Sequence, residues 1–260
     1  MLDTRVQRKA EKFWKSAGGI QSRFPRDIES AIAWSLPLFV VRLPRLWVRD
    51  VESYLRQRQL PVVIGPTADR QLHGCVLAIR GKGLIIVDGT DKPPQVRFTI
   101  AHEAAHFMLD YQGPRLRAVE RLGESIHSVL DGERAPSPEE RVDGLLANAP
   151  VSLYAHFMHR DNAGFVSNKI LEAESQADCL AFELIAPEAE VWRVVSKGFA
   201  KRGYQQRLTT VRRLLVRRFG LPTEAAPQYA ASLCRSRFGG ASVREWLGMD
   251  KPSGPFRFTK

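Results

Sequence analysis

The segment His102-Glu103-Ala104-Ala105-His106 constrains the fold more than any other feature of the chain. In a helix, side chains at positions i and i+4 lie on one face, so both imidazoles can bind a single metal ion. Glu103 lies beside them, where its carboxylate can deprotonate a metal-bound water. Zinc lowers the pKa of such a water to about 7 and so produces a nucleophile at neutral pH. The pattern predicts a helix with a catalytic zinc site at His102 and His106 and with Glu103 as the general base. The alternative is a solvated or core helix that carries two histidines by coincidence.

A catalytic zinc site needs a third protein ligand, and a glutamate on a later helix is the best candidate. The segment that begins at Glu174 and ends at Asp178 places two carboxylates one turn apart in a predicted helix over 170–185. We expect Glu174 to bind zinc and Asp178 to hold a ligand histidine through its outer ring nitrogen. The extended metzincin motif is excluded, because Leu109 and Gln112 occupy its Gly and His positions. The other third ligands that this reasoning leaves open are Glu172, Glu183, His156 and His159.

Hydrophobic periodicity and turn residues predict a mostly helical α+β chain with a small mixed or antiparallel sheet. The predicted helices cover residues 4–17, 27–34, 46–60, 95–111, 170–185, 190–197, 208–219, 223–233 and 241–247. The predicted strands cover residues 61–64, 75–80 and 84–87, with a hairpin turn at Gly81-Lys82-Gly83. We expect Gly113-Pro114 to end the helix that carries the two histidines, and the polar residues 115–168 to form an insertion.

Composition and cysteine usage indicate an ordinary globular protein. The chain is 44% hydrophobic and 26% charged, which excludes collagen-like, low-complexity and wholly disordered classes. Three cysteines, an odd number, argue against a disulfide framework and favour a reducing compartment. The N-terminus lacks a signal-peptide pattern, and prolines and arginines interrupt the most apolar stretch, residues 31–48. We therefore expect a cytoplasmic protein with no membrane association.

The net charge of +11 is concentrated near the C-terminus. Residues 193–218 contain nine cations and no acidic residue, and most of the nine are arginines, which suit bidentate contact with phosphates. Aromatic residues nearby can stack on the bases of a single strand. We expect this segment to contact single-stranded DNA; the alternative is a solvated face docked on the acidic insertion. The residues expected to make the contact are Arg202, Arg207, Arg212, Arg213, Arg217 and Arg218.

Two segments of the chain resemble the ImmA/IrrE family of metallopeptidases. Residues 97–106 resemble the active-site helix of that family, and residues 174–187 resemble its second helix. The resemblance covers roughly residues 44–190. There are two departures: Ala105 stands where the family usually has Gly, and the interval between the two segments is longer than usual.

The resemblance implies a zincin-like fold and a site-specific zinc endopeptidase. Its implied partner is a cognate helix-turn-helix repressor, whose cleavage derepresses a damage-response, mobile-element or antiphage operon. In size and basic character the chain also resembles the CapP-like proteases of antiphage operons. The domains implied are an N-terminal helical segment (1–43), a metallopeptidase core (44–190, with insertion 115–168) and a basic C-terminal helical module (191–260).

Two other functions stay open on the residues alone. One is a nucleic-acid-binding regulator whose zinc site is structural or catalytically silent. The other is a toxin–antitoxin component that binds its partner without cutting it. Residues 208–233 also resemble a helix-turn-helix-type module, but fold alone does not assign a role.

A protease binds its substrate as an extended chain, and an exposed sheet edge offers backbone groups to receive it. We expect strand 75–80 to be that edge, which places Cys75 near the metal as a candidate inhibitory fourth zinc ligand. The alternative for Cys75 is a small buried hydrophobic side chain. The reaction also needs a donor for the developing oxyanion. The candidates are Tyr111, Tyr154, His156, His159 and Tyr204.

Overall fold

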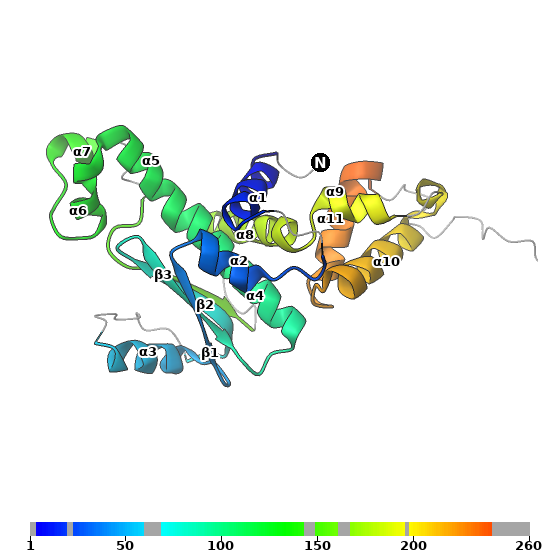
Figure 1. Cartoon of the computed structure of the whole chain (residues 1–260), viewed down its shortest axis with the longest axis horizontal. Coiled ribbons are helices and arrows are strands. Elements are labelled where there is room, and N and C mark those ends of the chain that lie inside the picture. Colours follow the sequence, from blue (N-terminus) through cyan, green and yellow to red (C-terminus); the bar gives the residue numbers. More distant parts are fainter. Residues whose placement is uncertain are drawn as a thin grey trace, which may run out of the picture.

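The computed structural model describes residues 4–19, 23–59, 69–142, 149–160, 167–195 and 198–240. This part of the chain is mostly helical and contains one small mixed sheet, which confirms the predicted α+β class (Figure 1). The elements are α1 (Thr4–Ser16), α2 (Ile28–Ser35), β1 (Leu38–Leu43), α3 (Val48–Gln57), β2 (Leu72–Ile79), β3 (Lys82–Asp88), α4 (Pro93–His106), the π-helix η1 (Phe107–Gln112), α5 (Gly113–Leu122), η2 (Glu124–Ile126), α6 (His127–Leu130), α7 (Pro138–Val142), β4 (Tyr154–His159), α8 (Asn168–Ile185), α9 (Glu188–Val194), η4 (Phe199–Lys201), α10 (Tyr204–Leu214), the π-helix η5 (Leu215–Phe219) and α11 (Ala226–Phe238).

The sheet has the strand order β1-β3-β2-β4, with β1 parallel to β3 and the other pairs antiparallel. The predicted hairpin is present as β2 and β3. Its turn is Arg80-Gly81 rather than the predicted Gly81-Lys82-Gly83, and both turn residues have positive φ, as the right-handed twist of paired strands favours. The prediction that strand 75–80 is a sheet edge is wrong, because β2 pairs with β3 on one side and with β4 on the other. The edge next to β2 is β4, which comes from the segment expected to be an insertion.

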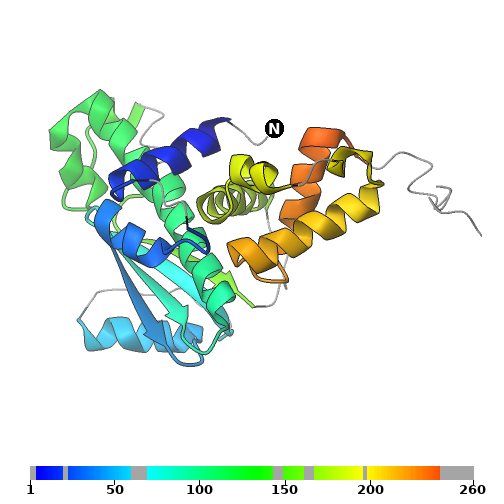
Figure 2. The ribbon, with the colours of Figure 1, turned by 45° about the vertical axis from the view of Figure 1, so that its right-hand side comes forward.

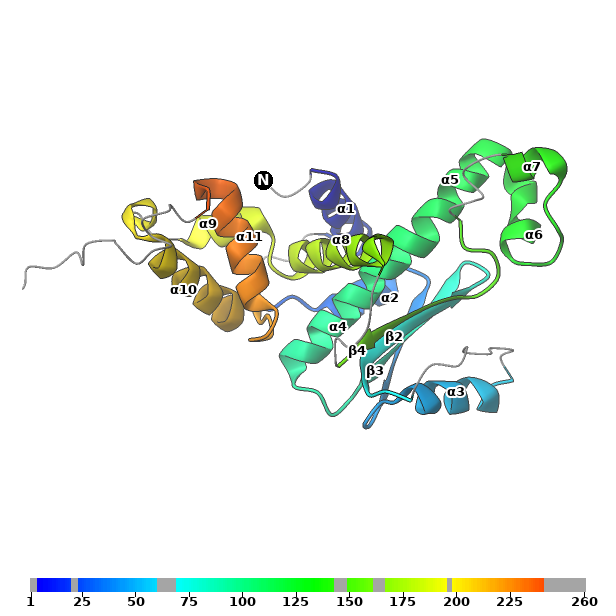
Figure 3. The same cartoon turned by 180° about the vertical axis from the view of Figure 1, so that it is seen from behind.

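Helices cover both faces of the sheet. Figure 3 shows α3 on one side and α4 with α8 on the other. Alternation along β2 decides which side chains meet which helix: Val76 and Ala78 belong to the core beneath α4, whereas Cys75 and Leu77 pack with α3. Helix α4 lies between the sheet and α8, so every residue from Phe98 to His106 is buried. The two motif histidines therefore lie in an environment that excludes most water.

One hydrophobic core contains residues from all three predicted domains. It includes Phe13 of α1, Ile32 of α2, Ala104 of α4, Leu184 of α8 and Leu233 of α11. The segment 1–43 also supplies β1, a strand of the central sheet. Figure 2 shows α10 and α11 beside α8 at the C-terminal end of the chain. The three predicted domains are thus parts of one packed unit over the described residues.

The sequence predicted that the helix carrying the two histidines ends at Gly113-Pro114, and this prediction is wrong. The helix continues from α4 through η1 into α5, and Figure 1 shows one long helix with α6 and α7 at its far end. In η1 the Gly113 N–H donates to the carbonyl of Met108, five residues back. This wider turn precedes Pro114, which occupies the first turn of α5, where a missing N–H is tolerated. Helices α5 and α6 enclose a small separate cluster around Ile126.

Two predicted elements, strand 61–64 and helix 241–247, lie outside the described residues. The predicted helix 208–219 is observed as the end of α10 followed by η5. Among the described helices, none is both long enough and apolar enough to cross a membrane.

Candidate metal centre

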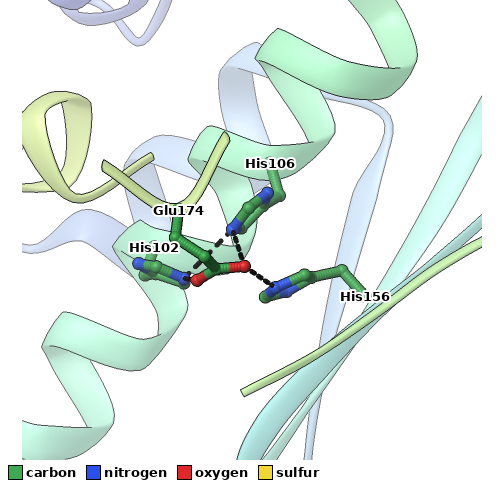
Figure 4. A group of neighbouring side chains, drawn as sticks. All are labelled: His102, His106, His156 and Glu174. Atoms are coloured by element: carbon green, nitrogen blue, oxygen red, sulfur yellow. Dashed lines mark hydrogen bonds and ion pairs between the residues drawn. The ribbon is translucent and has the colours of Figure 1, made fainter. Parts of the chain in front are cut away.

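Three histidines and one glutamate converge on the face of α4 that meets the edge strand β4 and helix α8. His102 and His106 come from α4, His156 from β4 and Glu174 from α8 (Figure 4). One ligand atom from each of the four lies within 4.8 Å of the others. The rings of His106 and His156 stack, with centroids 3.6 Å apart and planes at 22°. These four residues form a cluster that could hold a metal ion.

The distances fit a small tetrahedral ion. The two Nε2 atoms of His102 and His106 lie 3.1 Å apart. Glu174 brings one carboxylate oxygen to 3.3 Å from the first and the other to 3.5 Å from the second. Ligands about 2.0–2.1 Å from a tetrahedral ion lie about 3.3–3.4 Å from each other. Nitrogen and carboxylate donors together suit zinc and its neighbours among the transition metals, rather than calcium or magnesium.

Burial and hydrogen bonding act in opposite directions on the ionisation of these groups. Burial alone would raise the pKa of Glu174, but hydrogen bonds from the three imidazoles lower it far below its usual value. Burial would likewise lower the pKa of His102, yet its bonds to Asp178 and Glu174 raise it to about 9. Glu174 is therefore ionised, and the carboxylates around His102 favour a positive charge there, carried either by a proton on the ring or by a metal ion that replaces it.

Carboxylates orient the outer nitrogens of the two α4 histidines. His102 Nδ1 lies 3.0 Å from Asp178, as the sequence predicted, and His106 Nδ1 lies 2.7 Å from Asp110. Such partners fix the ring so that Nε2 is directed toward the place where a metal ion would bind. Sequence reasoning missed Asp110, although its spacing of four residues from His106 on a helix was a usable signal. The Tyr154 hydroxyl donates to the same Asp110 carboxylate at 3.4 Å.

Glu103 is fully buried beside this cluster, and one of its oxygens has no protein partner. Its Oε2 accepts a hydrogen bond from His156 Nδ1 at 3.0 Å. Its Oε1 is buried without a hydrogen bond to any described residue. Leaving a buried carboxylate oxygen unpaired is costly, so this atom is suited to a water or another small polar ligand at the centre. The donor set and this orphaned oxygen both fit a metal ion with an associated water.

The structure does not bring Cys75 to the cluster. Its side chain is fully buried on the opposite face of the sheet, in the cluster with Leu46, Val51 and Leu55. Burial raises the pKa of the Cys75 thiol well above its usual value, so a thiolate is disfavoured there. The expectation that Cys75 is a fourth zinc ligand came from treating its strand as the sheet edge, and this placement corrects it.

Of the alternative ligands and oxyanion donors, only His156 belongs to the cluster. Glu172 is exposed and accepts from Gln176, and Glu183 is buried where it caps the N-terminus of α9. The Tyr111 hydroxyl accepts the N–H of Gly81 at 2.8 Å and so supports the hairpin turn. Of the remaining candidates, His156 lies in the cluster, Tyr154 contacts Asp110, His159 lies on β4 outside the cluster, and Tyr204 lies on α10.

A groove of about 1590 Å³ opens onto the cluster. It runs along β4 and is bounded by the first turns of α8 and by the segment from Val216 to Gln228. Ile170 and Leu171, each about half exposed, lie along it one turn before Glu174. The groove is thus open to solvent and has an apolar side next to the candidate metal ligand.

The predicted basic stripe divides between two environments. Arg202, Arg213 and Arg217 line a second groove of about 720 Å³ along α10, together with glutamines and threonines. The Arg207 guanidinium instead lies 4.9 Å over the ring of Phe238. Two further predicted contacts, Arg212 and Arg218, are exposed and do not line this groove.

No family model matches the chain, and no curated protein matches it.

Proposed function

We propose that this protein is a zinc-dependent, site-specific endopeptidase of the ImmA/IrrE type that cleaves a cognate helix-turn-helix repressor. The observation that supports it most is the pairing of the His102, His106 and Glu174 triangle with the unpartnered Oε1 of Glu103. A structural metal site has no need of a buried carboxylate with one oxygen unpaired, whereas a hydrolase needs a base in that position.

In this proposal His102, His106 and Glu174 hold the zinc ion, which would polarise the substrate carbonyl and lower the pKa of a water. Glu103 accepts the proton of the attacking water at Oε1 and later delivers it to the leaving amine. His156 is held by Glu103 through Nδ1, and its Nε2, which lies 2.7 Å from Glu174 Oε1, is the donor that would pass to the oxyanion that forms on the substrate. Asp178 and Asp110 keep the ligand rings oriented throughout.

The substrate chain would extend β4 on its outer side. Within the described residues β4 pairs only with β2, and the groove follows its length. Adding an extended segment to this edge supplies backbone hydrogen bonds and brings the scissile carbonyl next to His156. This proposal replaces the earlier expectation for β2, an interior strand that has no edge to offer.

The arginine groove supports single-stranded DNA as a stimulating ligand, and it also supports the competing function of a nucleic-acid-binding regulator with a silent metal site. Three arginines on one face suit a phosphate backbone. The two grooves meet in η5: Val216 lines the groove that opens onto the candidate metal centre, and the adjacent Arg217 lines the groove with the arginines. Affinity for an oligonucleotide should fall with added salt and in Arg213→Ala/Arg217→Ala. Salt-independent binding would contradict this part of the proposal.

The deciding experiment incubates the purified protein with the repressor encoded beside it, with and without single-stranded DNA, and follows intact masses. We expect one cut in the repressor with the wild type and none with Glu103→Gln. That variant should still bind zinc, because Glu103 is not a member of the ligand cluster. If the wild type and Glu103→Gln both bind zinc and neither cuts the repressor under any condition, the result would favour the nucleic-acid-binding regulator instead.

A further inference from the structure

Helix α11 reaches the candidate metal centre through one side chain. Gln228 Nε2 donates to Asp178 Oδ2 at 3.1 Å. The other oxygen of the same carboxylate, Oδ1, lies 3.0 Å from Nδ1 of His102. Two successive hydrogen bonds therefore link the C-terminal module to a candidate metal ligand on α4.

Gln228 is exposed, but the backbone that carries it is firmly held. The next residue, Tyr229, is fully buried and stacks on Phe182 with ring centroids 4.6 Å apart and planes at 6°. Its hydroxyl donates to the carbonyl of Ala186 at 2.9 Å. Phe182 in turn packs against Phe98, one turn before His102 on α4. Because α11 is fixed on α8, the backbone at Gln228 is held in place, and only the Gln228 side chain has to be ordered for its amide to reach Asp178.

A carboxylate that orients a metal ligand works best when its own plane is fixed. The amide holds the distal oxygen of Asp178, so that Oδ1 stays directed at His102. We infer that Gln228 is a positioning residue for His102, through which the C-terminal module raises the metal affinity of the centre. This inference rests on the metal site of the proposed function and not on peptidase activity.

The test measures Zn²⁺ affinity of the full chain by competition with a chromophoric chelator, together with the absorption spectrum of the Co²⁺ form. Gln228→Met keeps the size of the side chain and removes the donor; Gln228→Glu also places a second carboxylate beside Asp178. We expect about 3- to 10-fold weaker zinc binding for Gln228→Met, less than the roughly 10- to 100-fold typical of residues that touch the ligand directly. Gln228→Glu should lose more, and its Co²⁺ spectrum should shift.

Gln205→Met is the matched control, because Gln205 is an exposed glutamine on α10 that lines the arginine groove instead. It should bind zinc as the wild type does. With excess chelator, all these variants should unfold at the same temperature as the wild type, because the inferred role is exerted on the metal. Wild-type zinc affinity in both Gln228 variants would overturn the inference.

A double-mutant cycle tests the route through Asp178. In the Asp178→Ala background, Gln228→Met should cause no further loss of affinity. An equal loss in both backgrounds would show that Gln228 acts elsewhere and would also overturn the inference. These outcomes can be distinguished from those that test the proposed peptidase activity. Zinc binding that depends on Gln228, without repressor cleavage, would refute only the peptidase activity. Repressor cleavage with zinc binding that does not depend on Gln228 would refute only this inference.

Discussion

The tetrapeptide Ala-His-Phe-Met occurs twice, at 105–108 and at 155–158, and each copy supplies a histidine to the centre. The first copy is helical and the second lies in β4. The two histidines differ in their outer partners. His106 is held by Asp110, whose only proposed role is to orient that ring. His156 is held by Glu103, the proposed base. His156 also lies only 2.7 Å from Glu174, a hydrogen-bond distance shorter than the edge of a metal tetrahedron.

From these partners we predict that His156 acts on the substrate rather than on the metal. His156→Ala should keep zinc within a few-fold of the wild-type affinity and lower kcat by about 10²- to 10³-fold, the usual cost of losing one oxyanion donor. Chelator competition and repressor cleavage measure the two quantities. His159→Ala, on the same strand but outside the cluster, is the control. Loss of zinc from the His156 variant would instead identify it as a ligand.

A second residue-scale prediction concerns stability and pH. Glu183 is buried near Glu188 and Tyr229, and burial raises its pKa from 4.5 to about 7. Because its pKa is higher in the folded than in the unfolded chain, the folded state favours the protonated carboxyl. Its contribution is full below the ordinary glutamate pKa and is lost as pH rises through the interval from 4.5 to about 7. The loss is of order 3 kcal/mol.

Glu183→Gln should remove that part of the pH dependence, which urea unfolding at several pH values between 5 and 8 would measure. Glu172→Gln, on the exposed face of the same helix, should leave the pH dependence unchanged. Parallel stability–pH curves for the Glu183 variant and the wild type would contradict the prediction.

At the scale of elements, the close approach of β2 to α4 positions the metal ligands. A Cβ added at Gly74 would lie 2.5 Å from Cγ2 of Thr99 and 2.9 Å from the carbonyl oxygen of Ile86. Thr99 is one turn before His102 on α4. A glycine at this point therefore lets the helix rest directly on the strand.

Gly74→Ala should force α4 away from the sheet and destabilise the protein by about 1–3 kcal/mol, as overpacking of a core does. It should also weaken zinc binding, because α4 carries two of the candidate ligands. Denaturant unfolding and chelator competition measure these effects. Gly240→Ala, where an added Cβ meets nothing within 4 Å, is the control. Wild-type stability of the Gly74 variant would show that the contact relaxes freely.

At the scale of the whole molecule, the candidate metal centre joins side chains from α4, β4 and α8, elements far apart in sequence. An ion that binds only the folded arrangement stabilises it by mass action. We predict that zinc at about 100 times its dissociation constant adds about 2.7 kcal/mol to the free energy of unfolding. A chelator should lower Tm, and added zinc should restore it. A His102→Ala/His106→Ala variant should show no zinc-dependent change in Tm. A wild-type Tm that is the same with and without zinc would exclude a metal site coupled to folding.

The parts of the site that could be predicted from the sequence are those set by helix geometry. The i, i+4 spacing of His102 and His106 requires only a helix, and Glu174 with Asp178 repeats that spacing on a second one. The structure brings these four side chains together. The hairpin and the α+β class follow in the same way from local turn residues and periodicity.

Tertiary structure alone decided the rest. Which strand is the edge, and which face Cys75 occupies, depend on strand order and register, and a shift of one residue would turn every side chain to the other face. His156 and Gln228 reach the centre only because β4 pairs with β2 and α11 docks on α8, contacts between residues far apart in the chain. Local sequence determines a helix or a turn because those backbone contacts span a few residues. It does not determine a pairing of distant segments, because the free energy of that pairing belongs to the packed core as a whole.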